Sequence, residues 1–153
     1  MSAHPDVGDR APLIDHLDHR GQRVHTAPDG HAWVVYFYPR DGTPVCTRQA
    51  CSFQDRLSEL ERLDARVVGV SADDAASHRD FADRHGLGFP LIADTAGQLS
   101  RAFDVGRALG VVSNRVTFVI DGQGIIRLRY QAQLAAGRHV DKAASVLADL
   151  DAG

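Results

Sequence analysis

Residues 36–51 read YFYPRDGTPVCTRQAC and decide the fold that we predict for this chain. Residues 31–38, which overlap the start of this stretch, are dense in β-branched and aromatic side chains, a pattern typical of a strand. Two prolines and a glycine then interrupt the strand and predict a turn. After the turn, apolar residues recur at helical spacing and predict a helix that runs to about Leu63. These residues are Cys46, Ala50, Phe53, Leu57 and Leu60.

The predicted helix carries a thiol, Cys46, in its first turn. The unpaired N–H groups of a first turn and the positive end of the helix dipole favour a thiolate over a thiol. The dipole contributes about 0.3–1 kcal/mol, whereas one pKa unit costs about 1.36 kcal/mol, so the dipole alone is too weak. A thiol that is mostly ionised at neutral pH therefore needs a nearby cation. The alternative for Cys46 is an inert thiol buried on an apolar helix face.

The second cysteine, Cys51, lies five residues later in the same predicted helix. Residues five apart in an α-helix have Cα atoms roughly 8–9 Å apart and project about 140° apart around the axis. A disulfide rarely tolerates a Cα separation of more than about 7 Å. Either the two thiols never meet, or the helix unwinds locally to let them meet. The second alternative describes a redox cycle with a conformational step.

The composition limits the classes of function. A chain of 153 residues with 44% hydrophobic residues predicts a single domain, residues 1–153, and a net charge of −3 gives no basic surface for nucleic acid or an anionic membrane. We find no signal-like leader and no apolar run of about 18 residues, so we expect a cytoplasmic protein outside the membrane. In a reducing cytosol a cysteine pair is more often catalytic or redox-sensing than a permanent crosslink. The eight histidines are scattered, and two cysteines five apart do not match a usual zinc half-site, so we expect no metal.

The rest of the sequence predicts an α/β fold with a mixed central β-sheet flanked by helices. Residues 32–38 and 66–70 are short apolar runs, as expected for parallel central strands that helices join. Between the second run and a later extended piece, residues 89–92, a helix is expected from about Asp73, after a Ser71 cap, to just before Gly86.

The second half of the chain predicts an antiparallel addition to this sheet. Residues 121–124 read DGQG, a strong hairpin signal between two strand-like runs, and Leu99, Ala102 and Phe103 indicate a short helix before them. The last helix, residues 138–150, has an apolar stripe that packs on the sheet. At the other end, residues 13–17 and 22–25 predict an N-terminal β-hairpin, which we place at the edge of the main sheet.

Several segments together carry a family resemblance. FYP at 37–39, TPVCT at 43–47 and AC at 50–51 resemble the active-site signature of peroxiredoxins of the Q, or bacterioferritin-comigratory, type. The resemblance extends over nearly the whole chain and narrows the expected fold to a thioredoxin-like one. The other matching segments are VGDRAP at 7–12, VGVS at 68–71 and RVTFVID at 115–121.

The resemblance implies a function and a set of site residues. Cys46 corresponds to the peroxidatic cysteine and Cys51 to the resolving one, while Thr43 and Arg115 match the remaining catalytic positions. The implied enzyme is an atypical 2-Cys peroxiredoxin. It reduces hydrogen peroxide and alkyl hydroperoxides through a Cys46 sulfenic acid and an intramolecular Cys46–Cys51 disulfide, which thioredoxin or a similar dithiol donor reduces. No haem, flavin or metal is required, and we expect a monomer.

Arg115 is the candidate for the cation that the thiolate needs, because the helix dipole alone is too weak. On spacing alone, an arginine that opens an apolar strand is usually a solvated strand end. A guanidinium near the sulfur would instead favour the thiolate and bind the leaving oxygen as charge develops on it.

Two residues depart from the pattern of the Q type. Val45 stands where this type commonly has Gly, and Gln49 stands where it commonly has Glu. Gln49 still donates and accepts hydrogen bonds but brings no negative charge. The departures therefore concern the rate and the unwinding of the helix, and they leave the reaction class unchanged.

Two other functions would also use a cysteine pair on this fold. A thiol–disulfide oxidoreductase would act on other proteins, but the chain has no Cys-x-x-Cys motif; an insulin-reduction assay separates this class. A non-enzymatic redox sensor or binding protein would form the same disulfide slowly. The second-order rate of Cys46 oxidation separates that class.

Overall fold

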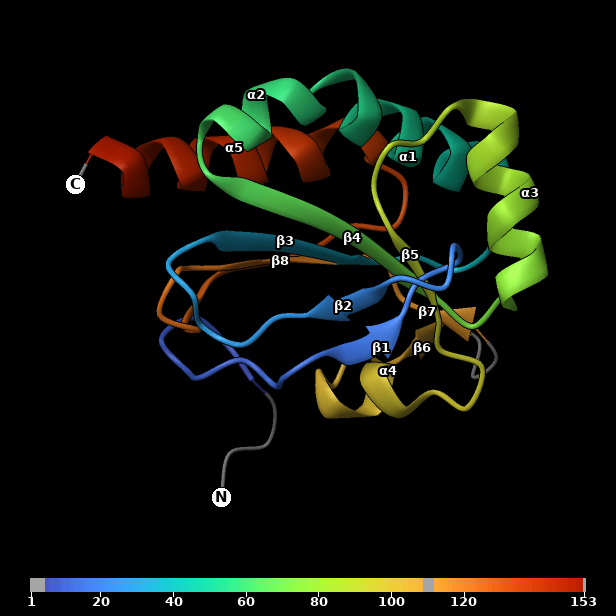
Figure 1. Cartoon of the computed structure of the whole chain (residues 1–153), viewed down its shortest axis with the longest axis horizontal. Helices are drawn as coiled ribbons and strands as arrows, with labels where there is room; N and C mark the ends of the chain where they lie inside the picture. Colours follow the sequence, from blue (N-terminus) through green and yellow to red (C-terminus); the bar gives the residue numbers. More distant parts are fainter. Residues whose placement is uncertain (1–4, 109–111, 153) are drawn as a thin grey trace.

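A five-stranded mixed sheet forms the centre of the computed structural model, which describes residues 5–108 and 112–152 (Figure 1). Its first three strands in space are parallel, and the remaining two are added antiparallel, which confirms the predicted mixed sheet. In spatial order the strands are β5 (Leu91–Ala93), β4 (Ala65–Ser71), β3 (Ala32–Phe37), β8 (Val116–Ile120) and β9 (Ile126–Gln131).

The helices divide between the two faces of the sheet. Their bounds are α1 (Pro44–Asp55), α2 (Leu57–Arg62), α3 (Ala75–His85), α4 (Gln98–Ala102) and α5 (Ala136–Ala152). Figure 1 shows α1, α2 and α5 above the sheet and α4 below it. Side chains of α1, α2, α3 and α5 form one core with the upper face, and α4 contributes to a second core on the lower face. The central strand serves both cores, because Val34 and Tyr36 point to the first while Val35 and Phe37 point to the second.

The cysteine helix is shorter than we predicted. We expected one helix to about Leu63, but it ends at Asp55, and Arg56, with φ −107° and ψ 10°, separates it from α2. The break places the guanidinium of Arg56 against Glu59 at 2.9 Å and against Asp141 of α5 at 2.6 Å. The predicted apolar stripe is nevertheless buried across both helices, since Leu60 of α2 is as fully enclosed as Phe53 of α1.

The helix after β4 begins later than expected, because a different residue caps it. Ser71 is the last residue of β4, and the side chain of Asp74 accepts a hydrogen bond from the backbone N–H of Ser77 at 2.8 Å. The predicted Ser71 cap is therefore wrong. Gly86 ends the helix with φ +63°, a left-handed conformation that glycine adopts without steric cost, as the predicted end at this residue requires.

The N-terminal hairpin exists but is not an edge of the main sheet. Its strands β1 (Asp15–Leu17) and β2 (Arg23–His25) pair only with each other. Three residues per strand give too short a ladder to extend the sheet, and the hairpin instead buries Ile14 and Val24 in the lower core. The turn of the hairpin contacts β5 through His19, whose backbone N–H donates to the carbonyl of Leu91 at 2.9 Å.

A second small sheet, which the sequence did not indicate, joins β6 (Arg107–Ala108) and β7 (Val112–Ser113). The DGQG hairpin and the last helix are confirmed, since β8 pairs with β9 and the predicted stripe of α5 is buried. In the described part of the chain, no helix combines the length and the apolar character needed to cross a membrane.

Candidate active site

Cys46 lies in the first turn of α1, on the face of the helix that points into the upper core. Its side chain is only 1% exposed. Pro44 occupies the first helical position, where its missing N–H costs nothing and its fixed φ suits the helix. The thiol is therefore held beside the unpaired N–H groups of the helix start, as the sequence predicted.

Thr43 occupies the N-cap position with an extended backbone, φ −74° and ψ 152°. Its side chain does not cap the helix, although threonine often does so. The hydroxyl instead donates to the carbonyl of Arg40 at 3.1 Å. Among the described residues, no hydrogen bond is donated to this hydroxyl, so its oxygen can still accept one.

Arg115 reaches Cys46 because of the register between two strands. Phe37, the last residue of β3, pairs with Val116, the first residue of β8. Arg115 therefore lies beside the point where β3 ends and the loop to Cys46 begins. Its Nη1 donates to Cys46 Sγ at 3.3 Å, and the side chain is buried.

Two glutamines hold the guanidinium in this position. Gln133 accepts from Arg115 Nε through its backbone carbonyl at 2.9 Å and from the Arg115 backbone N–H through its side chain, also at 2.9 Å. Gln49 accepts from Arg115 Nη1 at 2.6 Å. The same nitrogen thus contacts both the sulfur and the amide oxygen of Gln49, and the amide nitrogen of this fully buried Gln49 has no hydrogen-bond partner among the described residues.

Among the described residues, the buried guanidinium has no carboxylate counterion. None of the ion pairs formed by these residues includes Arg115. Charges in a protein interior are costly unless they are paired. The groups that Arg115 Nη1 does contact are the sulfur of Cys46 and the amide oxygen of Gln49.

Two further titratable side chains near this contact are neutral. Burial, followed by the charge at Cys46, raises the pKa of Tyr36 well above its usual value. Burial lowers the pKa of His139, and the charge of Arg115 lowers it further. His139 makes hydrogen bonds with Thr117 Oγ1 at 2.7 Å and with the carbonyl of Ala132 at 2.8 Å, which suit a neutral ring. Arg115 is therefore the charged side chain that contacts the sulfur, while Tyr36 and His139 add no charge beside it.

Cys51 lies in the same helix, one and a half turns after Cys46, and is partly exposed. Both cysteines are free thiols, and α1 is continuous between them. The geometric conflict that the sequence predicted is therefore present in the structure. A disulfide between them requires α1 to unwind.

Comparison with known proteins now places the chain. The family model described as the AhpC/TSA family matches residues 7–129. The chain belongs to the AhpC/TSA family. Among curated members, peroxiredoxin Q of Populus jackii, a chloroplastic protein, is 38% identical over 150 residues, which cover 97% of this chain and 70% of that relative.

Solved structures related to this AhpC/TSA member support the same placement. Peroxidoxin BcpB from Mycobacterium tuberculosis has a TM-score of 0.88 at 30% identity and covers 96% of this chain and 99% of that one. The bacterioferritin comigratory protein of Xanthomonas campestris, studied for its alkyl peroxide reduction activity, has a TM-score of 0.84 at 29% identity and covers 94% and 99%. The resemblance to Q-type peroxiredoxins and the thioredoxin-like fold are confirmed, and the chain is a thiol-dependent peroxidase.

The structure brings together some of the residues that we predicted for the site. Arg115 contacts Cys46 directly, whereas Thr43 lies at the helix start and Cys51 further along α1. Sequence analysis missed Gln133, Tyr36 and His139, because each comes from a different element and no local spacing connects them. Gln49 was recognised only as a departure from the family pattern.

Proposed function

We propose that Cys46 is the peroxidatic cysteine of this thiol-dependent peroxidase, and that Arg115 and Thr43 act on the bound peroxide. The observation that supports this proposal best is the 3.3 Å contact between Arg115 Nη1 and Cys46 Sγ. The reaction needs a nucleophilic sulfur, and this contact places a buried positive charge beside it.

In the first step, the thiolate of Cys46 attacks the terminal oxygen of hydrogen peroxide or of an alkyl hydroperoxide. The O–O bond breaks, the sulfur is oxidised to a sulfenic acid, and the other oxygen takes a proton and leaves as water or an alcohol. Arg115 stabilises the negative charge that develops on the leaving oxygen. The hydroxyl of Thr43 orients the peroxide by hydrogen bonding.

In the second step, the first turn of α1 unwinds and the thiol of Cys51 attacks the sulfenic sulfur. A Cys46–Cys51 disulfide forms and water leaves. Thioredoxin or a similar dithiol donor then reduces the disulfide through a mixed disulfide and is itself oxidised. One chain supplies both cysteines, so the proposed cycle runs in a monomer. The need for a dithiol reductant is consistent with a cytoplasmic location.

Mass spectrometry after one equivalent of peroxide tests the pairing directly. We expect a loss of two hydrogens, and a peptide map that joins Cys46 to Cys51. Two species that remain separate, with no partner thiol attached, would contradict the second step.

Two variants separate the steps. Cys46→Ser should abolish peroxide consumption, whereas Cys51→Ser should still undergo the first oxidation but lose turnover supported by thioredoxin. If Cys51→Ser turns over at the normal rate with thioredoxin, Cys51 is not the resolving cysteine.

A further inference from the structure

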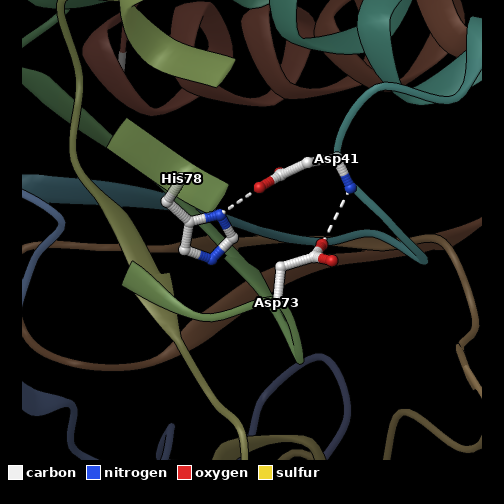
Figure 2. A group of neighbouring side chains, drawn as sticks. All are labelled: Asp41, Asp73 and His78. Atoms are coloured by element: carbon white, nitrogen blue, oxygen red, sulfur yellow. Dashed lines mark hydrogen bonds and ion pairs between the residues drawn. The ribbon is translucent and has the colours of Figure 1, made fainter. Parts of the chain in front are cut away.

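A partly buried polar cluster lies beside the loop that leads to Cys46. Figure 2 shows its three members, Asp41 in this loop, Asp73 just after β4, and His78 in α3. The ring of His78 faces the carboxylate of Asp41, and the carboxylate of Asp73 faces the backbone nitrogen of Asp41. The peroxidase chemistry proposed above uses none of the three.

Hydrogen bonds within the protein account for this cluster. His78 Nδ1 lies 2.6 Å from Asp41 Oδ2, and His78 Nε2 lies 3.1 Å from the carbonyl oxygen of Ile92. Asp73 Oδ2 accepts from the Ser71 hydroxyl at 2.7 Å and from the Asp41 N–H at 2.8 Å. These residue types could hold a divalent cation, but the ligand atoms are already engaged with one another, so a hydrogen-bonded network describes the cluster better.

Both nitrogens of the His78 ring face oxygen acceptors. An ionised Asp41 suits its surroundings. Its carboxylate also accepts from Tyr38 at 2.6 Å and from Ser77 at 2.9 Å. Burial opposes ionisation of Asp41, but hydrogen bonds from His78, Tyr38 and Ser77 outweigh it and lower the pKa of the carboxyl. The side chains of His78 and Asp41 are 0% and 5% exposed, so the two form a buried hydrogen-bonded pair.

The pair fixes the chain at a point close to the reacting sulfur. Asp41 stands five residues before Cys46, and its side chain and its backbone N–H are both held, by α3 and by the segment after β4. Gly42 then turns the chain with φ +80°, and Thr43 begins the helix. The position of Asp41 thus determines where the first turn of α1 starts.

We propose that His78 and Asp41 are positioning residues that fix the near end of the segment which unwinds during the cycle, and so hold Thr43 and Cys46 in place for peroxide attack. This inference rests on the proposed roles of Thr43 and Cys46. When the first turn unwinds to form the disulfide, the contact between Asp41 and His78 of α3 stays in place. The turn rewinds from this fixed point after reduction.

The test uses the rate of the first oxidation, measured in a single turnover of the reduced protein. His78→Phe keeps a ring but removes both donors, and we expect the second-order rate constant for hydrogen peroxide to fall by about tenfold or more. His78→Asn restores a donor near the position of Nδ1 and should recover part of the rate. The matched control is His85→Phe on the same helix, where His85 already packs edge-on against Phe81; its rate should equal that of the unchanged protein.

A second readout separates positioning from a loss of stability. With excess peroxide, the Cys46 sulfenic acid is either attacked by Cys51 or oxidised further to sulfinic acid. A loosened first turn should favour attack by Cys51, so the fraction of protein trapped as Cys46 sulfinic acid should fall in His78→Phe. All rates are compared at a temperature where circular dichroism shows each variant folded. A folded His78→Phe variant that has the rate and the sulfinic fraction of the unchanged protein would overturn the proposal.

The hydrogen bond itself is tested without any variant at His78, which covers the case in which His78→Phe does not fold. Nitrogen-15 NMR of the unchanged protein should show hydrogen on His78 Nδ1, the nitrogen that faces Asp41, and an Nδ1 without hydrogen would overturn the proposal. Failure of this inference is distinguishable from failure of the proposed function: loss of peroxide consumption in Cys46→Ser would uphold the proposed function even if His78 had no effect.

Discussion

At the scale of single residues, the candidate site depends on the contact between Arg115 and Cys46. Arg115→Ala removes the guanidinium that, in the proposed function, stabilises the leaving oxygen. We expect the rate of Cys46 oxidation to fall by about 100-fold. Stopped-flow measurement of peroxide consumption checks this. Arg115→Lys, which keeps the charge but loses the planar fork, should lie in between; an unchanged rate in the alanine variant would remove Arg115 from the site.

Gln49 gives a second prediction at this scale. Its neutral amide touches the same Nη1 that contacts the sulfur, so Gln49→Glu would place a buried carboxylate on the guanidinium. The new carboxylate would pair with Arg115 and draw the guanidinium away from the sulfur. We expect the second-order rate constant of Cys46 oxidation by hydrogen peroxide, measured by stopped flow, to fall by about tenfold.

The control for Gln49→Glu adds the same charge elsewhere. Gln123 is exposed in the turn between β8 and β9, and Gln123→Glu should leave the rate constant of Cys46 oxidation unchanged. A rate constant that stays the same or rises in Gln49→Glu would show that the neutral side chain is not needed to keep Arg115 available to the sulfur.

At the scale of elements, the proposed cycle requires two states of α1. In the reduced protein it is continuous from Pro44 to Asp55. The proposed disulfide joins two residues that an intact helix keeps apart, so amide protection in residues 44–51 should be lost on oxidation, while β3 and β4 remain protected. Hydrogen exchange of the reduced and oxidised forms measures this. A disulfide-bonded form with full protection in residues 44–51 would contradict the unwinding step.

At the scale of the whole molecule, the two cores share one sheet. β3 contributes alternate side chains to both faces, so neither core can persist without the strand. We therefore predict a single cooperative unfolding transition, as for one domain. The fluorescence of Trp33 in the lower core and far-ultraviolet circular dichroism should give the same urea midpoint. Two separate midpoints would indicate that the cores unfold independently.

The stability of the molecule should depend on pH in two stages. Burial lowers the pKa of His19 and His139, so the unfolded chain binds protons more readily, and stability is lost as pH falls below about 6.5. Burial would raise the pKa of Asp18, Asp41 and Asp121, but the hydrogen bonds that each carboxylate accepts lower it overall. Their contribution is present above the unfolded value and is lost as pH falls below about 4. Urea unfolding at a series of pH values checks this, and a free energy of unfolding that stays constant from pH 7 to 3 would contradict it.

The sequence by itself determined the features that depend on neighbouring residues. The apolar runs of β3 and β4, the DGQG turn and the stripe of α5 are local patterns, because strand and helix periodicity place side chains on a face wherever the segment lies. The same logic put Cys46 at a helix start and showed that Cys51 is too far along that helix to reach it. Local patterns failed where two nearby residues could both cap the same helix: we predicted Ser71 as the cap of α3, but Asp74 caps it.

Only the tertiary structure decided which distant residues surround the thiol. Arg115 lies 69 positions from Cys46 in the sequence, and it meets the sulfur because β8 pairs with β3 in one register. His78 lies 37 positions from Asp41, and α3 brings the two together. A slip of one residue in a strand pairing turns every side chain to the other face, so such contacts are set by the packing of the whole sheet and leave no pattern in any short stretch of sequence.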